Sequence, residues 1–137
     1  MKLENITQIR VRYADTDKMG VVYNGNYLTF FEVGRTELMR SKGMPYKELE
    51  NAGYMLPLIE AHVNYKQSAF YDDILLVKAI VDLSEIRATL HFNYEIMVKD
   101  KLIATGWTVH TFVRMDNLKP VRPPQIFNNF VNSLKNN

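Results

Sequence analysis

Hydrophobic residues recur every three or four positions between residues 27 and 39, which is the spacing of one face of an α-helix. The residues on this face are Tyr27, Phe30, Phe31, Gly34 and Leu38, and Leu28, Val33 and Met39 widen it. So wide a face, with a glycine inside it where a second backbone could approach, predicts a helix buried in the core. Lys42 and Gly43 predict its end, because a basic last turn followed by a left-handed glycine often stops a helix.

Alternating hydrophobic and polar residues predict β-strands on both sides of this helix. A first strand is expected at residues 6–13, with Ile9, Val11 and Tyr13 on its core side. Further strands are expected at residues 59–66, 74–83, 88–98 and 102–113, with turns at residues 84–87 and 99–101. Gly106 would mark a bulge or a close approach between backbones. The last three strands would form an antiparallel meander.

The remaining segments predict short elements. Residues 45–53 favour a short second helix, and residues 114–124 favour a proline-broken loop. Ile126, Phe130 and Leu134 then predict a short amphipathic C-terminal helix. Together the pattern predicts an α+β fold in which five to six antiparallel strands wrap around one long central helix. One edge strand would stay unpaired, and two such edges could pair to make a dimer.

Composition limits the class of protein. A chain of 137 residues predicts a single domain, here residues 1–137. The absence of cysteine excludes disulfides, cysteine-based zinc sites and a thiol nucleophile, and it fits a reducing compartment. A net charge of +2 argues against an electrostatic nucleic-acid binder. No apolar run resembles a signal peptide or approaches the ~20 residues of a membrane span, so a cytoplasmic protein is expected.

Two carboxylates precede the long helix, Asp15 and Asp17, and the turn-forming residues 24–26 lie at its expected start. The free N–H groups of the first helical turn would point back towards these carboxylates. Hydrogen-bond donors and carboxylates would therefore share one small volume. Without a further motif, a purely structural role as turn or capping residues is the more frequent explanation of such a pair of aspartates.

The segment Y-A-D-T-D-K-M-G-V-V-Y-N-G-N-Y at residues 13–27 is followed by R-T-E at 35–37 and Y-K-Q-S-A-F-Y-D-D at 65–73. These motifs resemble the 4-hydroxybenzoyl-CoA thioesterase family, and more narrowly its Tol-Pal-associated acyl-CoA thioesterases. The resemblance covers nearly the whole chain up to the proline-rich loop. It implies a hotdog fold, assembly as a homodimer or homotetramer, and hydrolysis of an acyl-CoA thioester.

When the family motif is matched to this sequence, the catalytic carboxylate of the family corresponds to Asp17. It would act as a nucleophile or as a general base, while Asp15 would be structural. The helix N-terminal amide that polarises the thioester carbonyl corresponds to Asn24, with Gly25 beside it. The substrate contacts implied by the resemblance are therefore Asn24, Gly25, Tyr23 and Tyr13. A tyrosine facing the core of the first strand explains Tyr13 nearly as well.

Three further sets of residues are weaker candidates. Glu32 matches a helix carboxylate used by another branch of hotdog thioesterases, but an ion pair on the helix surface is favoured. Arg87, Lys119 and Arg122 could meet the phosphates of coenzyme A, or could be simple solvated charges. His62, His91 and His110 lie in predicted strands without metal-ligand spacing, and an Asp15–Asp17 magnesium pair lacks further acidic residues. No metal or other cofactor is expected.

Two other functions stay open. A hotdog dehydratase or thioesterase acting on acyl carrier protein is one; such dehydratases use a histidine near the active turn, and none precedes His62. A non-catalytic protein that binds acyl thioesters is the other, and Asp17 argues against it. Many relatives carry histidine where this chain has Asn24, and asparagine cannot transfer protons in the same way. The acyl group itself is not predicted.

Overall fold

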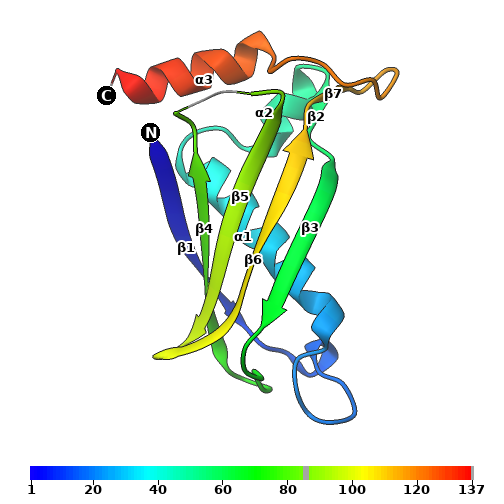
Figure 1. Cartoon of the computed structure of the whole chain (residues 1–137), viewed down its shortest axis with the longest axis vertical. Helices are drawn as coiled ribbons and strands as arrows, with labels where there is room; N and C mark the ends of the chain where they lie inside the picture. The colour runs from blue at the N-terminus through cyan, green and yellow to red at the C-terminus, as the bar shows by residue number, and fades with distance from the viewer. Residues whose placement is uncertain (85–86, 137) are drawn as a thin grey trace.

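A five-stranded antiparallel sheet is wrapped around one long helix in the computed structural model, which describes residues 1–84 and 87–136 (Figure 1). The strand order is β1-β4-β5-β6-β3. Its strands are β1 (Lys2–Arg10), β4 (Ile74–Asp82), β5 (Thr89–Val98), β6 (Lys101–Thr111) and β3 (Leu58–Tyr65). The helix against its inner face is α1 (Tyr27–Ser41). This is the predicted α+β arrangement, with five strands in the main sheet.

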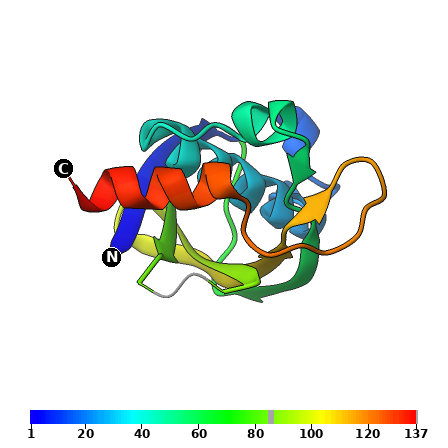
Figure 2. The same ribbon diagram turned by 90° about the horizontal axis from the view of Figure 1, so that it is seen from above.

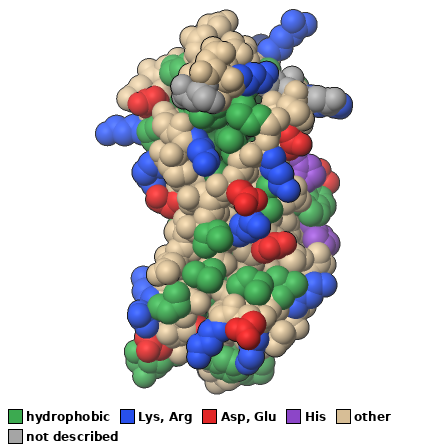
Figure 3. All heavy atoms as spheres, turned by 90° about the vertical axis from the view of Figure 1, so that its left-hand side faces the viewer, with side chains coloured by type: hydrophobic (Ala, Val, Ile, Leu, Met, Phe, Trp, Pro, Cys, Tyr) green, Lys and Arg blue, Asp and Glu red, His purple; other side chains and the backbone are tan. Residues whose placement is uncertain are grey.

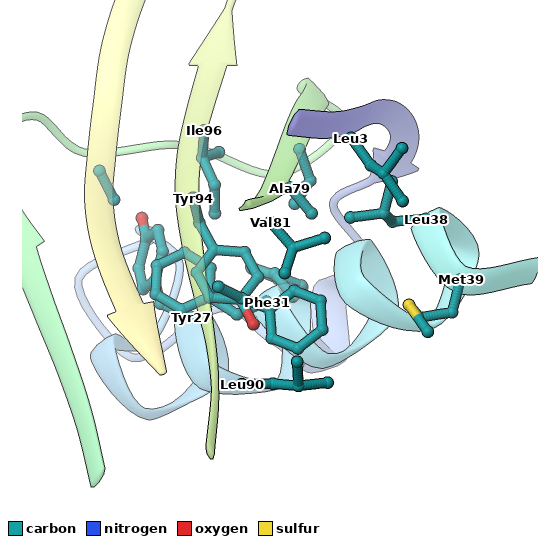
Figure 4. Packing of buried hydrophobic residues seen from close by; sticks show 14 of the residues in the cluster. Leu3, Tyr27, Phe31, Leu38, Met39, Ala79, Val81, Leu90, Tyr94 and Ile96 are labelled. Carbon is teal, nitrogen blue, oxygen red and sulfur yellow. The ribbon is translucent and has the colours of Figure 1, made fainter. Parts of the chain in front are cut away.

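The inner face of α1 forms the centre of the core (Figure 4). The predicted residues are buried there, namely Tyr27, Phe30, Phe31, Gly34 and Leu38, together with Met39. The Phe31 ring stacks on the Tyr94 ring of β5, with centroids 4.2 Å apart. The buried face of α1 is narrower than predicted, because Leu28 is 41% exposed and Val33 is half-buried. The helix therefore covers the sheet with one side and leaves its other side open.

Gly106 lets two backbones approach closely, as one of the two sequence-based alternatives predicts. It pairs with Val63 of β3, and a Cβ placed on it would collide with the carbonyl oxygen of His62 and with the Phe31 ring. No register shift occurs at Gly106, so the bulge alternative is wrong. The glycine thus fixes how closely β3 and α1 pack against β6.

The boundaries of two predicted strands are wrong. β1 starts at Lys2 and ends at Arg10, so Tyr13 is not a strand residue. The backbone turns instead into a short 3-10 helix, η1 (Tyr13–Asp15). At the other end of the sheet, β6 ends at Thr111, and the next residues form β7 (Val113–Arg114), which pairs with β2 (Tyr54–Met55).

Two helices close the end of the molecule away from residues 16–24 (Figure 2). α3 (Gln125–Lys135) is the predicted C-terminal helix, and it buries Phe127, Phe130 and Val131. α2 (Tyr46–Asn51) is the predicted short helix after Pro45. The turn expected at residues 84–87 includes residues 85 and 86, which lie outside the described residues. Within residues 1–84 and 87–136, no helix is long and apolar enough to cross a membrane.

The two edges of the sheet differ in character. Charged residues blunt the β1 edge, where Glu4 pairs with Lys78 and Arg10 with Asp72, and Figure 3 shows charged side chains spread over this side. The β3 edge instead exposes Leu58 and Ile59, at 44% and 56%. Because charges protect an edge strand and apolar side chains do not, β3 is the edge suited to pairing.

A buried chain of hydrogen bonds crosses the sheet beneath α1. The Tyr94 hydroxyl lies 2.6 Å from Thr108 Oγ1, which lies 2.9 Å from His110 Nε2. His110 Nδ1 lies 3.1 Å from the carbonyl oxygen of Leu56. Because a carbonyl only accepts, Nδ1 carries the proton and Nε2 accepts from Thr108 in the neutral ring. Burial, and then the positive charge of Arg35, lower the pKa of His110 to about 4.

We expect His110 to make the protein sensitive to acid. Its pKa is below the unfolded value of ~6.5, so the unfolded state binds the proton first and stability is lost as the pH falls from about 6.5 to 4. The shift corresponds to about 3 kcal/mol of unfolding free energy. Urea unfolding at pH 7 and pH 4.5 should show that the free energy of unfolding falls more for the wild type than for His110→Gln. Parallel losses in the two proteins would contradict this role.

Candidate active site

The loop before α1 folds back on itself around Asp17. The Asp17 amide donates to the carbonyl oxygen of Val21 (2.9 Å), and the Gly20 amide donates to the Asp17 carbonyl (3.0 Å). One carboxylate oxygen, Oδ1, accepts from the Met19 amide at 2.8 Å. The other oxygen, Oδ2, has no hydrogen-bond partner in the described part of the chain. A half-exposed carboxylate is thus held by its backbone with one oxygen free to react.

Asp15 is buried and organises this loop. Its carboxylate accepts from the Arg12 amide (2.8 Å) and pairs with the Arg12 guanidinium (3.0 Å). Burial alone would raise the pKa of Asp15, but the hydrogen bonds and charge of Arg12 outweigh it and hold the pKa below the ordinary value. Its carbonyl oxygen accepts from the Tyr23 amide (2.9 Å) and from Asn26 Nδ2 (2.8 Å). Asp15 therefore has the structural surroundings that the sequence predicts for it.

The start of the long helix lies directly beside this loop. Residues Asn24–Asn26 form a 3-10 turn, η2, that leads into α1, and no side chain caps the helix. Asn24 and Asn26 are residue types that often cap helices, but here neither side chain does so. The amides of Asn24 and Gly25 donate no hydrogen bond within the described residues, while the Asn24 carbonyl accepts from the Tyr65 hydroxyl at 3.0 Å. Two N–H donors remain free at the helix start.

The Asp17 carboxylate and the start of α1 share one pocket of about 390 Å³, which we call the Asp17 pocket. Its walls come from the loop, from α1 and from the segment that follows β3; they include Asp17, Met19, Val22, Asn24, Tyr27 and Tyr65. Asp17 also faces a more open hollow beside Tyr23 and Asn26. A free carboxylate oxygen and free amides around one space can hold a carbonyl group and stabilise an oxyanion. The structure thus brings together Asp17 and Asn24 in one pocket, and Gly25 follows Asn24 in η2.

The two candidate tyrosines lie outside the Asp17 pocket. Tyr23 is 52% exposed, and its ring lies against Gly25, where a Cβ would approach it to 2.6 Å. Tyr13 is 74% exposed, so its interpretation as a core residue of a strand is wrong. It stacks on the Tyr71 ring, with centroids 3.9 Å apart, and does not line the Asp17 pocket.

The other candidates lie away from Asp17. Arg87, Lys119 and Arg122 are exposed, and none of them lines the Asp17 pocket. The segments that carry them lie at the end of the molecule opposite residues 16–24 (Figure 1). Glu32 has no ion pair within the described residues; it lines a second pocket, bounded by α1, α2 and residues 54–57, which we call the α1–α2 pocket.

The three histidines lie in the sheet, away from the Asp17 pocket. His62 lies on β3, His91 on β5 and His110 on β6, as predicted for sheet residues, and none lines the Asp17 pocket. The part of the chain that the structure describes contains no cluster of three histidine, aspartate or glutamate side chains suited to a metal ion.

Two contacts of the site escaped the sequence analysis. Asn26 ties the helix start to the Asp15 carbonyl, and Tyr65 ties the end of β3 to the Asn24 carbonyl. Asn26 is a typical turn residue in sequence, and Tyr65 sits in an alternating strand. Neither pattern reveals a hydrogen-bond partner 11 or 41 residues away.

We expect Asn26→Ala to lower kcat about tenfold while KM changes by less than about threefold, because the Asp17 loop would no longer be fixed relative to the free amides. The lost hydrogen bond should reduce the unfolding free energy by only about 1 kcal/mol. Steady-state kinetics and urea unfolding measure the two effects. Thr29→Ala, an exposed position at the same helix end, is the control. Equal kinetics for Asn26→Ala and the wild type would contradict this role.

Comparison with known proteins agrees with this geometry. The sequence model of the thioesterase-like superfamily matches residues 11–131. The chain therefore belongs to the thioesterase-like superfamily, and its architecture is the hotdog fold.

The sequences and structures of individual relatives match most of the chain. A putative esterase of Aquifex aeolicus is 37% identical over 77% of this chain and 81% of its own. The acyl-CoA thioesterase YbgC of Haemophilus influenzae is 31% identical over 85% of this chain and 86% of its own. The crystal structure of a DHNA-CoA thioesterase from Staphylococcus aureus superposes with a TM-score of 0.89 at 37% identity, over 97% of this chain and 89% of that one.

Proposed function

We propose that this protein hydrolyses acyl-CoA thioesters at Asp17, with residues 1–137 acting as one domain. The observation that carries the proposal is the shared pocket: a half-exposed carboxylate faces the same space as the free amides of a helix start. Relatives at 30–31% identity are named acyl-CoA thioesterases or putative ones, which supports a CoA thioester as the substrate. No cofactor is needed for this reaction, which uses only water.

The reaction can follow two routes from this geometry. In the first, Asp17 attacks the thioester carbonyl carbon, the C–S bond breaks, and the CoA thiolate leaves and takes up a proton. Water then hydrolyses the mixed anhydride and restores Asp17. In the second, Asp17 takes a proton from a water molecule that attacks the carbonyl directly. In both routes the amides of Asn24 and Gly25 stabilise the oxyanion.

A panel of acyl-CoA esters, from acetyl-CoA to long-chain and aryl-CoA esters, tests the proposal. We expect the purified protein to release CoA thiol from at least one ester with a kcat/KM far above that of Asp17→Asn. Tight binding without turnover would favour the non-catalytic alternative. Turnover only of acyl carrier protein thioesters would favour an enzyme that acts on acyl carrier protein. Within the described residues, neither the Asp17 pocket nor the more open hollow beside it is lined by a histidine, which argues against a dehydratase.

The enzyme should assemble through β3. Among the described strands β3 pairs only with β6, and its free edge exposes apolar side chains. Two copies can pair β3 with β3 in antiparallel fashion around a two-fold axis, which makes a dimer, and two dimers could form a tetramer. This arrangement would place the end of one subunit that carries α2 and α3 beside the Asp17 loop of its partner. Arg87, Lys119 and Arg122 could then meet CoA phosphates across the interface. We expect the enzyme in the cytoplasm, because a chain without cysteine fits a reducing compartment.

Sedimentation at micromolar concentration should show a dimer or tetramer. Ile59→Lys should weaken dimerisation at least tenfold, because it places a charge on the apolar β3 edge. Ile6→Lys, at a position of similar exposure (58%) on β1, should leave the dimer intact. A stable wild-type monomer, or equal effects of the two variants, would contradict assembly through β3.

A further inference from the structure

Tyr65 is the last residue of β3, and it lies at the end of the molecule where α1 begins (Figure 1). Its hydroxyl donates to the carbonyl oxygen of Asn24 at 3.0 Å, across 41 residues of sequence. The same carbonyl accepts the backbone N–H of Tyr27, and a carbonyl oxygen has lone pairs for both bonds. Tyr65 also lines the Asp17 pocket together with Asn24. A side chain from the sheet thus bonds directly to the turn η2, which carries the free amides.

The sheet fixes Tyr65 in two ways. The amides of Lys66 and Gln67, which follow it in the chain, both donate to the carbonyl oxygen of Ile103 in β6, at 2.9 and 3.1 Å. The Tyr65 ring meets the buried Tyr27 ring edge to face, with centroids 5.4 Å apart and an angle of 82° between the planes. Backbone and ring together therefore define where the Tyr65 hydroxyl lies.

Only two side-chain hydrogen bonds hold the turn η2 within the described residues. One runs from Asn26 Nδ2 to the carbonyl oxygen of Asp15, at 2.8 Å. This bond ties η2 to the Asp17 loop but not to the sheet. The other is the bond from the Tyr65 hydroxyl, which ties η2 to the sheet. Since no side chain caps α1, the place of the helix start relative to the sheet depends on Tyr65.

The position of η2 matters for the proposed reaction. Free amides stabilise an oxyanion best when they already point at the place where its charge develops. The Asn24 carbonyl and the Gly25 N–H belong to one planar peptide group, so a bond to the carbonyl also fixes the plane of that N–H. The same bond polarises the peptide group and strengthens its N–H as a donor. The Tyr65 hydroxyl can thus improve a donor that it does not touch.

The exposure of Tyr65 separates this contact from core packing. Tyr65 is 55% exposed, so water could satisfy its hydroxyl without the Asn24 carbonyl. The hydrogen bond is therefore not required for burying the side chain. Loss of the hydroxyl alone should leave the core and the β3–β6 pairing intact.

We propose that Tyr65 is a positioning residue for thioester hydrolysis. Its hydroxyl holds η2 against the sheet so that the free amides of the helix start meet the carbonyl oxygen of the thioester. It acts through the Asn24–Gly25 peptide group and not on the reacting atoms. This inference rests on the proposed function and adds a residue from β3 to it.

Tyr65→Phe tests the role of the hydroxyl, because it keeps the ring against Tyr27. We expect kcat for the best acyl-CoA ester to fall about tenfold while KM changes by less than about threefold, since the interaction is made mainly in the transition state. Tyr71→Phe is the matched control. Tyr71 is 46% exposed and stacks on Tyr13, and its hydroxyl makes no hydrogen bond within the described residues. This control should keep the wild-type kcat.

Two uncleavable CoA analogues measure binding of the carbonyl without turnover. S-(2-oxoheptyl)-CoA carries a ketone near the sulfur atom, and S-heptyl-CoA has the same chain without the oxygen. Calorimetry should show that the wild type binds the ketone about fivefold more tightly, as one net hydrogen bond would give. Tyr65→Phe should lose most of this preference and keep its affinity for S-heptyl-CoA. A role in packing alone would weaken the binding of both analogues alike.

The outcomes separate this inference from the proposed function. If the wild type hydrolysed no ester, loss of the ketone preference in Tyr65→Phe would still support the positioning role. Normal turnover with an unchanged ketone preference in Tyr65→Phe would overturn the inference and leave the proposed function intact. Equal losses of kcat in Tyr65→Phe and Tyr71→Phe, or a wild type without any ketone preference, would overturn the inference as well.

Discussion

Replacing Asp17 by asparagine should lower kcat at least ~10²-fold, because the amide can neither attack the thioester nor take a proton from water. The fold should survive. The Oδ1 atom of asparagine can still accept from the Met19 amide, as Asp17 Oδ1 does at 2.8 Å. Circular dichroism and urea unfolding should therefore be close to those of the wild type, while steady-state release of CoA thiol falls.

Two neighbouring carboxylates provide the controls. Asp15→Asn should reduce the unfolding free energy by about 1–3 kcal/mol, because Asp15 is buried and holds Arg12 through charged hydrogen bonds. It should harm stability more than the rate. Glu32→Gln should retain activity, since Glu32 lines the α1–α2 pocket and not the Asp17 pocket. An inactive Glu32→Gln protein together with an active Asp17→Asn protein would reverse the assignment of the catalytic carboxylate.

Replacing Gly106 by alanine should reduce the unfolding free energy by about 3 kcal/mol, as expected for overpacking against groups that cannot move aside. The new methyl group would meet the His62 carbonyl oxygen in the backbone of β3 and would lie 2.6 Å from Phe31 Cε2. Either β3 separates from β6 or α1 lifts off the sheet. Thermal or urea unfolding measures the loss.

Gly34→Ala is the matched comparison, because Gly34 is also buried between α1 and the sheet. Its new methyl group would lie 2.8 Å from Val77 Cγ1, and its three nearest contacts are all side-chain atoms. Alanine also favours a helix over glycine by roughly 1 kcal/mol, so the net loss should be smaller than for Gly106→Ala. If Gly106→Ala proved as mild as Gly34→Ala, the close approach of β3 to β6 would be wrong.

Periodicity alone located most of the secondary structure. The α1 stripe, the stop at Gly43 and the hairpin after Val98 follow from local chemistry, because side-chain spacing and the needs of left-handed turns act within a few residues. The family motif likewise located Asp17. The errors lie where tertiary contacts override a local pattern. Tyr13 continues an alternating run, yet the Arg12–Asp15 pair turns the chain before it can join the sheet.

The α1–α2 pocket was the least predictable part of the structure. Arg35 and Tyr46 are 11 positions apart on different helices, and only the packing of α2 against α1 brings both into one pocket. Their lack of partners depends on how neighbouring polar atoms are already satisfied. The hydrogen bonds of these neighbouring atoms cannot be deduced from the sequence alone.

The sequence by itself determined the order of the strands and helices along the chain and the apolar face of α1, and its motif indicated Asp17 as the proposed catalytic carboxylate. Each of these depends on residues close together in the chain. Only the tertiary structure decided that Asp17 and Asn24 share one pocket, that Asn26 and Tyr65 hold the helix start, and that β3 is the open edge. These features arise from contacts between distant segments, whose geometry is fixed by close packing in three dimensions and not by local propensity.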